Sequence, residues 1–157
     1  EPTAKEVWES IDDPKNYDEV VFCGFGEPTL RLDVIKEVSK KIKDSGGRVR
    51  LNTNGHGNVI NKRNILPELS GLVDEVSVSL NADSSEAYDE ICNPLPKFRN
   101  GIYEKIKEFI EEAKKHIPEV QASIVTHQKD VDEVQCETMV KENFGVKYRA
   151  RRYNIVG

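Results

Sequence analysis

The sequence is poor in cysteine and histidine and contains no long apolar run. Its three cysteines, Cys23, Cys92 and Cys136, are widely separated and form no Cys-x-x-Cys pair, which argues against a disulfide framework and against a zinc ribbon. The three histidines are equally scattered, so we predict no metal site formed by this chain alone. No apolar stretch approaches the roughly 20 residues that a membrane-spanning helix needs, so we expect no membrane contact.

Basic residues are not in excess either. The chain has 23 Lys and Arg against 28 Asp and Glu, which gives a formal net charge of −5. Such a chain is a poor candidate for generic binding to the phosphate backbone of nucleic acids. Because the first residues show no signal-peptide pattern, we expect a cytoplasmic location. The 157 residues suit a single domain over 1–157 that is large enough to bury a hydrophobic core.

Strand-like and helix-like segments alternate along the chain. We predict strands near residues 19–23, 48–53, 75–80, 120–125 and 146–153. A capping box at Thr3 and Glu6 predicts a short N-terminal helix, and apolar residues at helical spacing predict further helices near 32–42, 61–72, 102–113 and 131–140. A helix after each of the first four strands indicates βαβ units with right-handed crossovers, and therefore a parallel sheet.

Four of the predicted strands have one apolar and one polar face. In the second strand, for example, Val49, Leu51 and Thr53 alternate with polar residues. A doubly wound sheet is covered by helices on both faces, so its strands are usually apolar throughout. A curved sheet with helices on its outer face alone leaves the concave face free for polar residues. We therefore favour an α/β fold that forms a partial (β/α) barrel of about five parallel strands, with the doubly wound sheet as the alternative.

Polar groups and glycines gather where the predicted strands end, which is where both architectures bind their ligands. The turn at 23–29 contains two glycines and Glu27, a carboxylate able to hold a cation or an ammonium group. Hydroxyl and carboxamide groups end the next two strands and suit a ribose or an amino-acid backbone. Each of these residues alone can equally cap a helix or a turn. Their repetition at successive strand ends favours a ligand site.

Three ordered segments resemble the radical S-adenosylmethionine (SAM) enzymes. They are Val-Val-Phe-Cys-Gly-Phe-Gly-Glu-Pro-Thr-Leu at 20–30, Leu-Asn-Thr-Asn-Gly at 51–55 and Val-Ser-Val-Ser-Leu-Asn-Ala at 76–82. These segments look like the second, third and fourth strands of that family. Together with the Arg-Arg-Tyr-Asn sequence near the end, they make the chain most similar to the TatD-associated radical SAM proteins. The resemblance spans essentially the whole chain.

The resemblance implies SAM as the ligand. In the family, the Gly-Glu-Pro turn binds the amino group of SAM, polar residues at the end of the fourth strand meet the ribose, and the end of the next strand borders the adenine. Arg149 and Arg151 are candidates for an anionic substrate group or for the methionine carboxylate, unless they only solvate an open sheet edge. The implied cofactor-binding residues are Gly24, Phe25, Gly26, Glu27, Asn52, Asn54, Ser79, Asn81, Val125 and His127.

The chain departs from the family in one respect. Family members hold a [4Fe–4S] cluster with a Cys-x3-Cys-x2-Cys loop after their first strand. This chain has no such loop, and none of its cysteines has the spacing to replace it. We therefore expect a fragment that lacks the first barrel strand and the cluster segment, rather than a degenerate relative. The cluster is expected in the full-length protein alone.

The resemblance implies that the full-length protein cleaves SAM reductively to methionine and a 5′-deoxyadenosyl radical, which then abstracts hydrogen from an unidentified substrate. We expect this chain alone to be inactive and assign it no catalytic residue. The alternative is a non-catalytic module that binds a nucleoside-like ligand or a partner protein, such as a TatD-type hydrolase. A phosphate-binding barrel enzyme has less support, because Arg31 is the one basic residue near the glycine-rich turn. The exposed sheet edge also predicts self-association.

Overall fold

The computed structural model describes residues 1–24, 26–99, 101–126 and 131–152, and its centre is a five-stranded parallel sheet. The strands follow one another in space in the order β1-β2-β3-β4-β5, as they do in the sequence. Parallel neighbours need a crossover connection, and crossovers of one hand place their helices on one face. The strands are β1 (Val20–Phe22), β2 (Val49–Thr53), β3 (Glu75–Ser79), β4 (Glu119–Thr126) and β5 (Lys147–Arg152).

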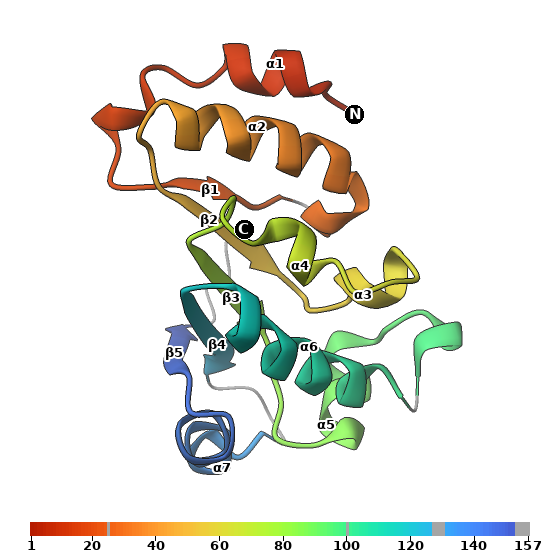
Figure 1. The fold of residues 1–157 in the computed structure, drawn as a ribbon. Helices are drawn as coiled ribbons and strands as arrows, with labels where there is room; N and C mark the ends of the chain where they lie inside the picture. The colour runs from red at the N-terminus through yellow and green to blue at the C-terminus, as the bar shows by residue number, and fades with distance from the viewer. Residues whose placement is uncertain (25, 100, 127–130, 153–157) are drawn as a thin grey trace.

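The main helices lie together on one side of the sheet, as Figure 1 shows for α2, α4 and α6. This one-sided arrangement confirms the α/β fold of five parallel strands and agrees with a partial (β/α) barrel. Four short turns complete the chain: 3-10 turns at Pro14–Asn16, Pro28–Arg31 and Pro96–Phe98, and a π-helical turn at Met139–Asn143. The helices are α1 (Ala4–Glu9), α2 (Leu32–Asp44), α3 (Gly57–Ile60), α4 (Leu66–Leu69), α5 (Ser85–Cys92), α6 (Ile102–His116) and α7 (Glu133–Thr138).

The strand register separates apolar from polar residues, as the alternation in the sequence predicts. Toward the helices, the sheet presents buried Val49, Leu51, Val76, Val78, Val120, Ala122 and Ile124. On the opposite face, polar residues are register partners: Asn52 pairs with Ser77, Ser79 with Ser123, and Ser123 with Arg149. Each fully buried aliphatic side chain stabilises the fold by about 1.5–3 kcal/mol, so one face supplies the core and the other is left for polar contacts.

Several helices differ from the sequence prediction. Of the helix expected at 61–72, the structure has α4 (Leu66–Leu69) alone, and α3 (Gly57–Ile60) precedes that stretch and was not predicted. Helix α5 was not predicted at all, although Ser84 caps it by accepting a hydrogen bond from the Ala87 N–H. The capping box at Thr3 and Glu6 is present and opens α1 as expected. Of the described helices, none has the length and apolar character needed to cross a bilayer.

The amino ends of the strands are joined by ion pairs. Arg48 contacts Glu75 at 3.3 Å and Glu119 at 2.8 Å, and Lys147 also pairs with Glu119. Asp74 accepts a hydrogen bond of 2.8 Å from the Val49 N–H. These contacts run from the start of β2 to the start of β5. They stabilise the end of the sheet that is opposite the carboxyl ends of the strands.

Candidate functional site

A cleft of about 260 Å³ lies at the carboxyl ends of β1, β2 and β3. Most of the residues predicted from the sequence are in its wall. Asn81 is outside this wall but accepts a hydrogen bond from Arg151, which is part of it. Val125 is half-buried and pairs with Arg151 in the sheet register. Arg149 is exposed, and Phe25 and His127 lie outside the described residues. The cleft is lined by Cys23, Gly24, Gly26, Glu27, Asn52, Thr53, Asn54, Ser79 and Arg151.

The Glu27 carboxylate holds the first two loops together. Its Oε1 accepts hydrogen bonds from Thr29 Oγ1 at 2.6 Å and from Thr53 Oγ1 at 2.7 Å. Its Oε2 accepts one from the Asn54 N–H at 2.8 Å. Glu27 also caps the 3-10 turn that follows, because Oε1 accepts from the Thr29 N–H at 3.2 Å. A carboxylate offers about four acceptor sites, so Oε2 keeps capacity for a further donor such as an ammonium group.

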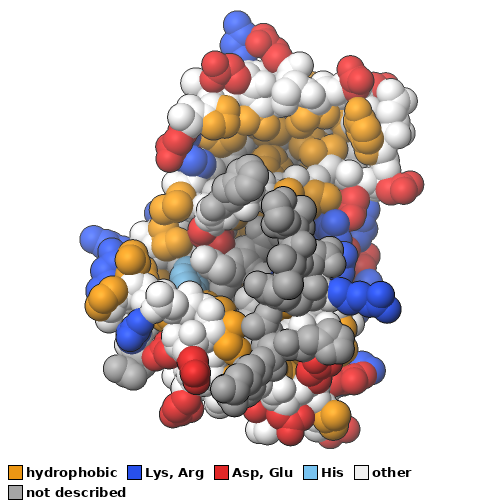
Figure 2. Space-filling view, turned by 180° about the vertical axis from the view of Figure 1, so that it is seen from behind, with side chains coloured by type: hydrophobic (Ala, Val, Ile, Leu, Met, Phe, Trp, Pro, Cys, Tyr) orange, Lys and Arg blue, Asp and Glu red, His pale blue; other side chains and the backbone are white. Residues whose placement is uncertain are grey.

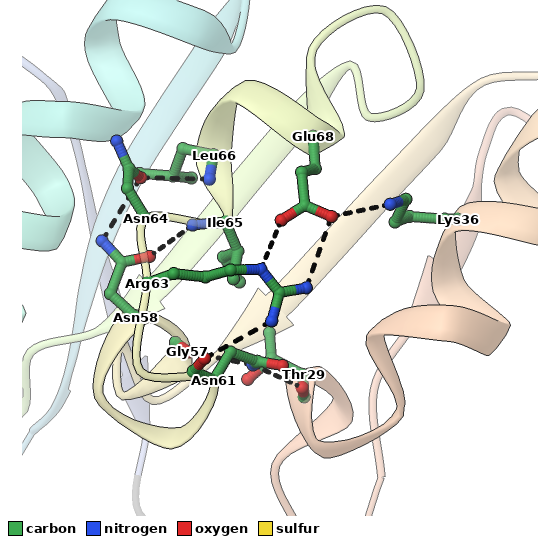
Figure 3. A network of polar contacts seen from close by, with 10 residues as sticks. All are labelled: Thr29, Lys36, Gly57, Asn58, Asn61, Arg63, Asn64, Ile65, Leu66 and Glu68. Carbon is green, nitrogen blue, oxygen red and sulfur yellow. Dashed lines mark hydrogen bonds and ion pairs between the residues drawn. The ribbon is translucent and has the colours of Figure 1, made fainter.

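Close packing positions the loop after β2. Gly55 has φ of +82°, a left-handed conformation that favours glycine, and its N–H donates to Thr53 Oγ1 at 3.0 Å. A Cβ on Gly57 would lie 2.7 Å from Ile65 Cδ1 and 3.2 Å from Thr29 Oγ1. Asn61 Nδ2 donates to the carbonyls of Thr29 and Gly57, which ties this loop to the Glu27 turn (Figure 3). The glycines therefore allow the two loops to approach each other.

Arg151 brings a positive charge into the cleft from β5. Its Nη2 donates to Asn81 Oδ1 at 3.1 Å and to Ser79 Oγ at 3.4 Å, which are both neutral acceptors. Its Nε is buried and has no hydrogen-bond partner, and within the described ranges no carboxylate forms an ion pair with it. Burial lowers the pKa of Arg151, and the charge of Arg149 lowers it further. A partly desolvated guanidinium in this state favours an anionic ligand.

Asn52 adds an unsatisfied acceptor to the same cleft. Its Oδ1 is buried without a hydrogen-bond partner. A buried acceptor left unpaired costs about 1–3 kcal/mol, which a donor on a bound ligand recovers. Acceptors on Glu27 and Asn52 together with the donor on Arg151 suit a ligand with an ammonium and a carboxylate group.

A sequence model described as the Radical SAM superfamily matches residues 1–139 of the chain. The chain belongs to this superfamily. Among solved structures, this radical SAM chain is similar to one titled "Structure of TYW1 with a lysine-pyruvate adduct bound", with a TM-score of 0.67 and 18% sequence identity. The alignment covers 88% of this chain and 43% of that one, so the chain spans less than half of the TYW1 chain. At this identity the likeness shows a shared fold. No curated protein matches the chain.

Radical SAM folds in general imply both SAM and a [4Fe–4S] cluster, but the cysteines described here do not fit the cluster. Cys23 is exposed, Cys92 is half-buried and Cys136 is buried, and all three are free thiols on separate elements. No group of three or more His, Cys, Asp or Glu side chains able to hold a metal occurs within residues 1–24, 26–99, 101–126 and 131–152. The described part of this radical SAM chain therefore supplies a polar cleft but no set of residues that fits a cluster.

Two features of the site were not predicted from the sequence. The alternation assigned Thr53 to the apolar face, yet its hydroxyl is one of the donors that hold Glu27. His56 and the α5 residues Tyr88 and Cys92 form the wall of a second pocket next to the cleft. The helical spacing of Ala87, Tyr88 and Ile91 after a Ser84 cap is the signal that indicates α5.

Proposed function

We propose that the cleft binds the methionyl part of SAM and that the chain is the SAM-binding core of a radical SAM enzyme of the TatD-associated kind. Superfamily membership supports radical SAM cleavage of SAM in general. The observation that supports binding of the methionyl part is the Arg151 guanidinium, whose acceptors among the described residues are neutral and which lines the same cleft as Glu27 and Asn52.

In this proposal each group of residues binds a different part of SAM. Arg151 binds the methionine carboxylate through a charge-assisted hydrogen bond, and Glu27 Oε2 and Asn52 Oδ1 accept from the ammonium group. Gly24 and Gly26 allow the ligand to approach the turn, because a Cβ at either position would meet no atom within 4 Å and the space is open. Ser79 and Asn81 face the ribose, and Val125 and His127 border the adenine. Arg149, which is exposed, remains for an anionic group of the substrate.

The test is calorimetric titration of the chain with SAM and with decarboxylated SAM. Arg151→Met should weaken SAM binding by roughly 10- to 100-fold, since a hydrogen bond between charged groups contributes about 1.5–3 kcal/mol. Decarboxylated SAM should bind weakly to both proteins and with little difference between them. Arg152→Met is the matched control, because Arg152 is exposed and follows Arg151 on the same strand but points to the opposite face. Equal losses in the two variants, or an equal effect of Arg151→Met on both ligands, contradict the assignment.

A second candidate is a non-catalytic binding module. The three free cysteines favour it, because they lie on separate segments and do not form a set that fits an iron–sulfur cluster. Anaerobic incubation of the chain with iron, sulfide, reductant and SAM separates the two candidates. We expect no 5′-deoxyadenosine from this chain alone. The full-length protein should release it, and its failure to do so would support the binding module. We further propose that the protein is cytoplasmic and that it contacts a TatD-type hydrolase. Co-purification of the two proteins tests the contact.

A further inference from the structure

A second pocket of about 420 Å³ adjoins the SAM cleft. Asn54 belongs to the walls of both, and Asn81, which accepts a hydrogen bond from Arg151, is in the wall of the second. The other walls come from α5 and from the segment that leads into the Pro96–Phe98 turn. Ligand sites typically have volumes of about 300–1,000 Å³ and mix apolar walls with a few polar groups. The described residues that line it are Asn54, His56, Asn81, Tyr88, Cys92, Pro94, Leu95 and Phe98.

Three rings form one side of this pocket. The centroid of the His56 ring lies 6.0 Å from that of Phe98 at an interplanar angle of 52°, and 6.4 Å from that of Tyr88. His56 Nε2 and the Tyr88 hydroxyl are hydrogen-bonded at 3.0 Å, which fixes both rings. Lys97 lies over the Phe98 ring at 4.8 Å but is not part of the lining. Leu95 is 62% exposed and contributes an apolar side chain to the wall of the pocket.

The lining carries no net charge at neutral pH. It contains no Asp, Glu, Lys or Arg among the residues that the structure describes. Burial lowers the pKa of His56 and keeps its imidazole neutral, although the nearby Glu27 charge acts in the opposite direction. Burial also raises the pKa of Tyr88 and of Cys92, so the phenol and the thiol stay protonated. The described lining therefore favours an uncharged ligand, because it offers no charged side chain to offset the hydration that a charged ligand loses.

We propose that this pocket binds an uncharged heteroaromatic ring of the substrate. Flat faces of Phe98 and His56 suit stacking or edge-to-face contact with such a ring. The Asn54 carboxamide and the Tyr88 hydroxyl offer polar groups to its edge. That the ring belongs to the substrate rests on the proposed SAM function, because the shared Asn54 places the ring beside the SAM cleft. The preference of the pocket for an uncharged ring does not depend on SAM.

The experiment uses benzimidazole as the probe and its 5-carboxylate as the charged analogue. Each is titrated into the ¹⁵N-labelled chain at pH 7.5 while amide shifts are followed. Benzimidazole should shift amides of α5 and of residues 93–98, and the carboxylate should bind at least threefold more weakly. Phe98→Ala should weaken benzimidazole binding three- to tenfold. Leu95→Trp places a larger side chain at the mouth of the pocket and should also weaken benzimidazole binding. Because Leu95 is exposed, this change removes no packing from the hydrophobic core. Val134→Ala, on exposed α7, should have no effect.

The same samples are titrated with SAM, so that the two proposals fail separately. Shifts elsewhere in the chain, equal binding of the carboxylate, or unchanged binding in both pocket variants would overturn the ring pocket. Loss of SAM binding alone, with benzimidazole behaving as expected, would overturn the SAM assignment and leave the pocket standing. If both proposals hold, Arg151→Met weakens SAM binding alone and Leu95→Trp weakens benzimidazole binding at least threefold.

Discussion

Glu27 and Thr53 are joined by a hydrogen bond of 2.7 Å, from the Thr53 hydroxyl to Glu27 Oε1, across the gap between two loops. Thr53 is 3% exposed and Glu27 is half-buried, so the bond is partly shielded from water. It stabilises the fold and also fixes the carboxylate in the cleft. Loop positioning and proposed ligand binding therefore depend on one side chain.

The first prediction removes this donor. Thr53→Val keeps the shape of the side chain but removes one donor from the partly buried Glu27 carboxylate, so we expect a loss of about 1.5–3 kcal/mol in the free energy of unfolding. Urea denaturation followed by circular dichroism measures this loss. Thr138→Val, at the exposed end of α7, is the matched control and should change stability by less than about 0.5 kcal/mol. Equal effects in the two variants would argue against the role of the bond.

The second prediction compares two glycines of the same conformation. Gly55 and Gly71 have φ of +82° and +76°, so alanine at either site costs about 1–2 kcal/mol in backbone strain. A Cβ at Gly55 would also lie 3.0 Å from Ile106 and 3.1 Å from Val78. A Cβ at Gly71 would have no described atom within 4 Å. Gly55→Ala should therefore lower the free energy of unfolding by a further 1–3 kcal/mol or so. Similar thermal midpoints of the two variants would contradict this packing argument.

The third prediction concerns pH. Glu68, on α4, accepts hydrogen bonds from Arg63 at 2.7 Å and from Lys36 of α2 at 2.6 Å (Figure 3). These partners, Arg63 first, lower its pKa from 4.5 to about 2. The folded state thus holds the proton less tightly than the unfolded state. The stabilisation is complete above pH 4.5 and is lost as the pH falls toward 2.

The measurement is the difference in unfolding free energy between the wild type and Glu68→Gln. We expect about 1–2 kcal/mol at pH 6, allowing for solvent screening of a partly exposed pair, and a progressive decrease of this difference below pH 4.5. Glu108→Gln serves as the control, because Glu108 is exposed and pairs with Lys105 of its own helix. A difference for Glu68→Gln that does not change with pH would show that the ion pairs do not set its pKa.

The fourth prediction addresses self-association at β1. Among the described strands, β1 and β5 are the edges of the sheet. The β5 edge carries Lys147, Arg149, Arg151 and Arg152, which deter pairing with another sheet. Beside β1 lies an apolar groove of about 480 Å³, with Val7, Ile11, Phe22 and Leu30 in its wall. Hydrophobic side chains gather over this upper part of the molecule in Figure 2.

We therefore expect concentration-dependent association through β1, measured by light scattering. Val21→Lys places a charge on the concave side of this strand and should reduce association at least severalfold. Val134→Lys adds the same charge on α7, at a site that is 75% exposed, and should leave association unchanged. A monomer at every concentration, or an equal effect of the two variants, would contradict association at this edge.

Local patterns in the sequence determined the two faces of the sheet and the long helices. Side chains alternate along any strand, so the polar set with Asn52 and Ser79 had to lie opposite the apolar set with Leu51 and Val78. The apolar spacing of α2 and α6 is equally local, and both helices formed where it predicts them.

Only the tertiary structure decided which of these residues meet. Arg149 and Arg151 share a strand and a face, and the register places Arg149 in line with Ser79. Among the described residues it is nevertheless Arg151 that donates to Ser79 and Asn81, which the register alone does not specify. The Thr53 hydroxyl holds Glu27 because the two loops pack closely, which no alternation of polar and apolar residues specifies. The second pocket likewise depends on where α5 packs. Contacts between residues distant in the sequence are set by packing over the whole chain rather than by periodicity in a short segment.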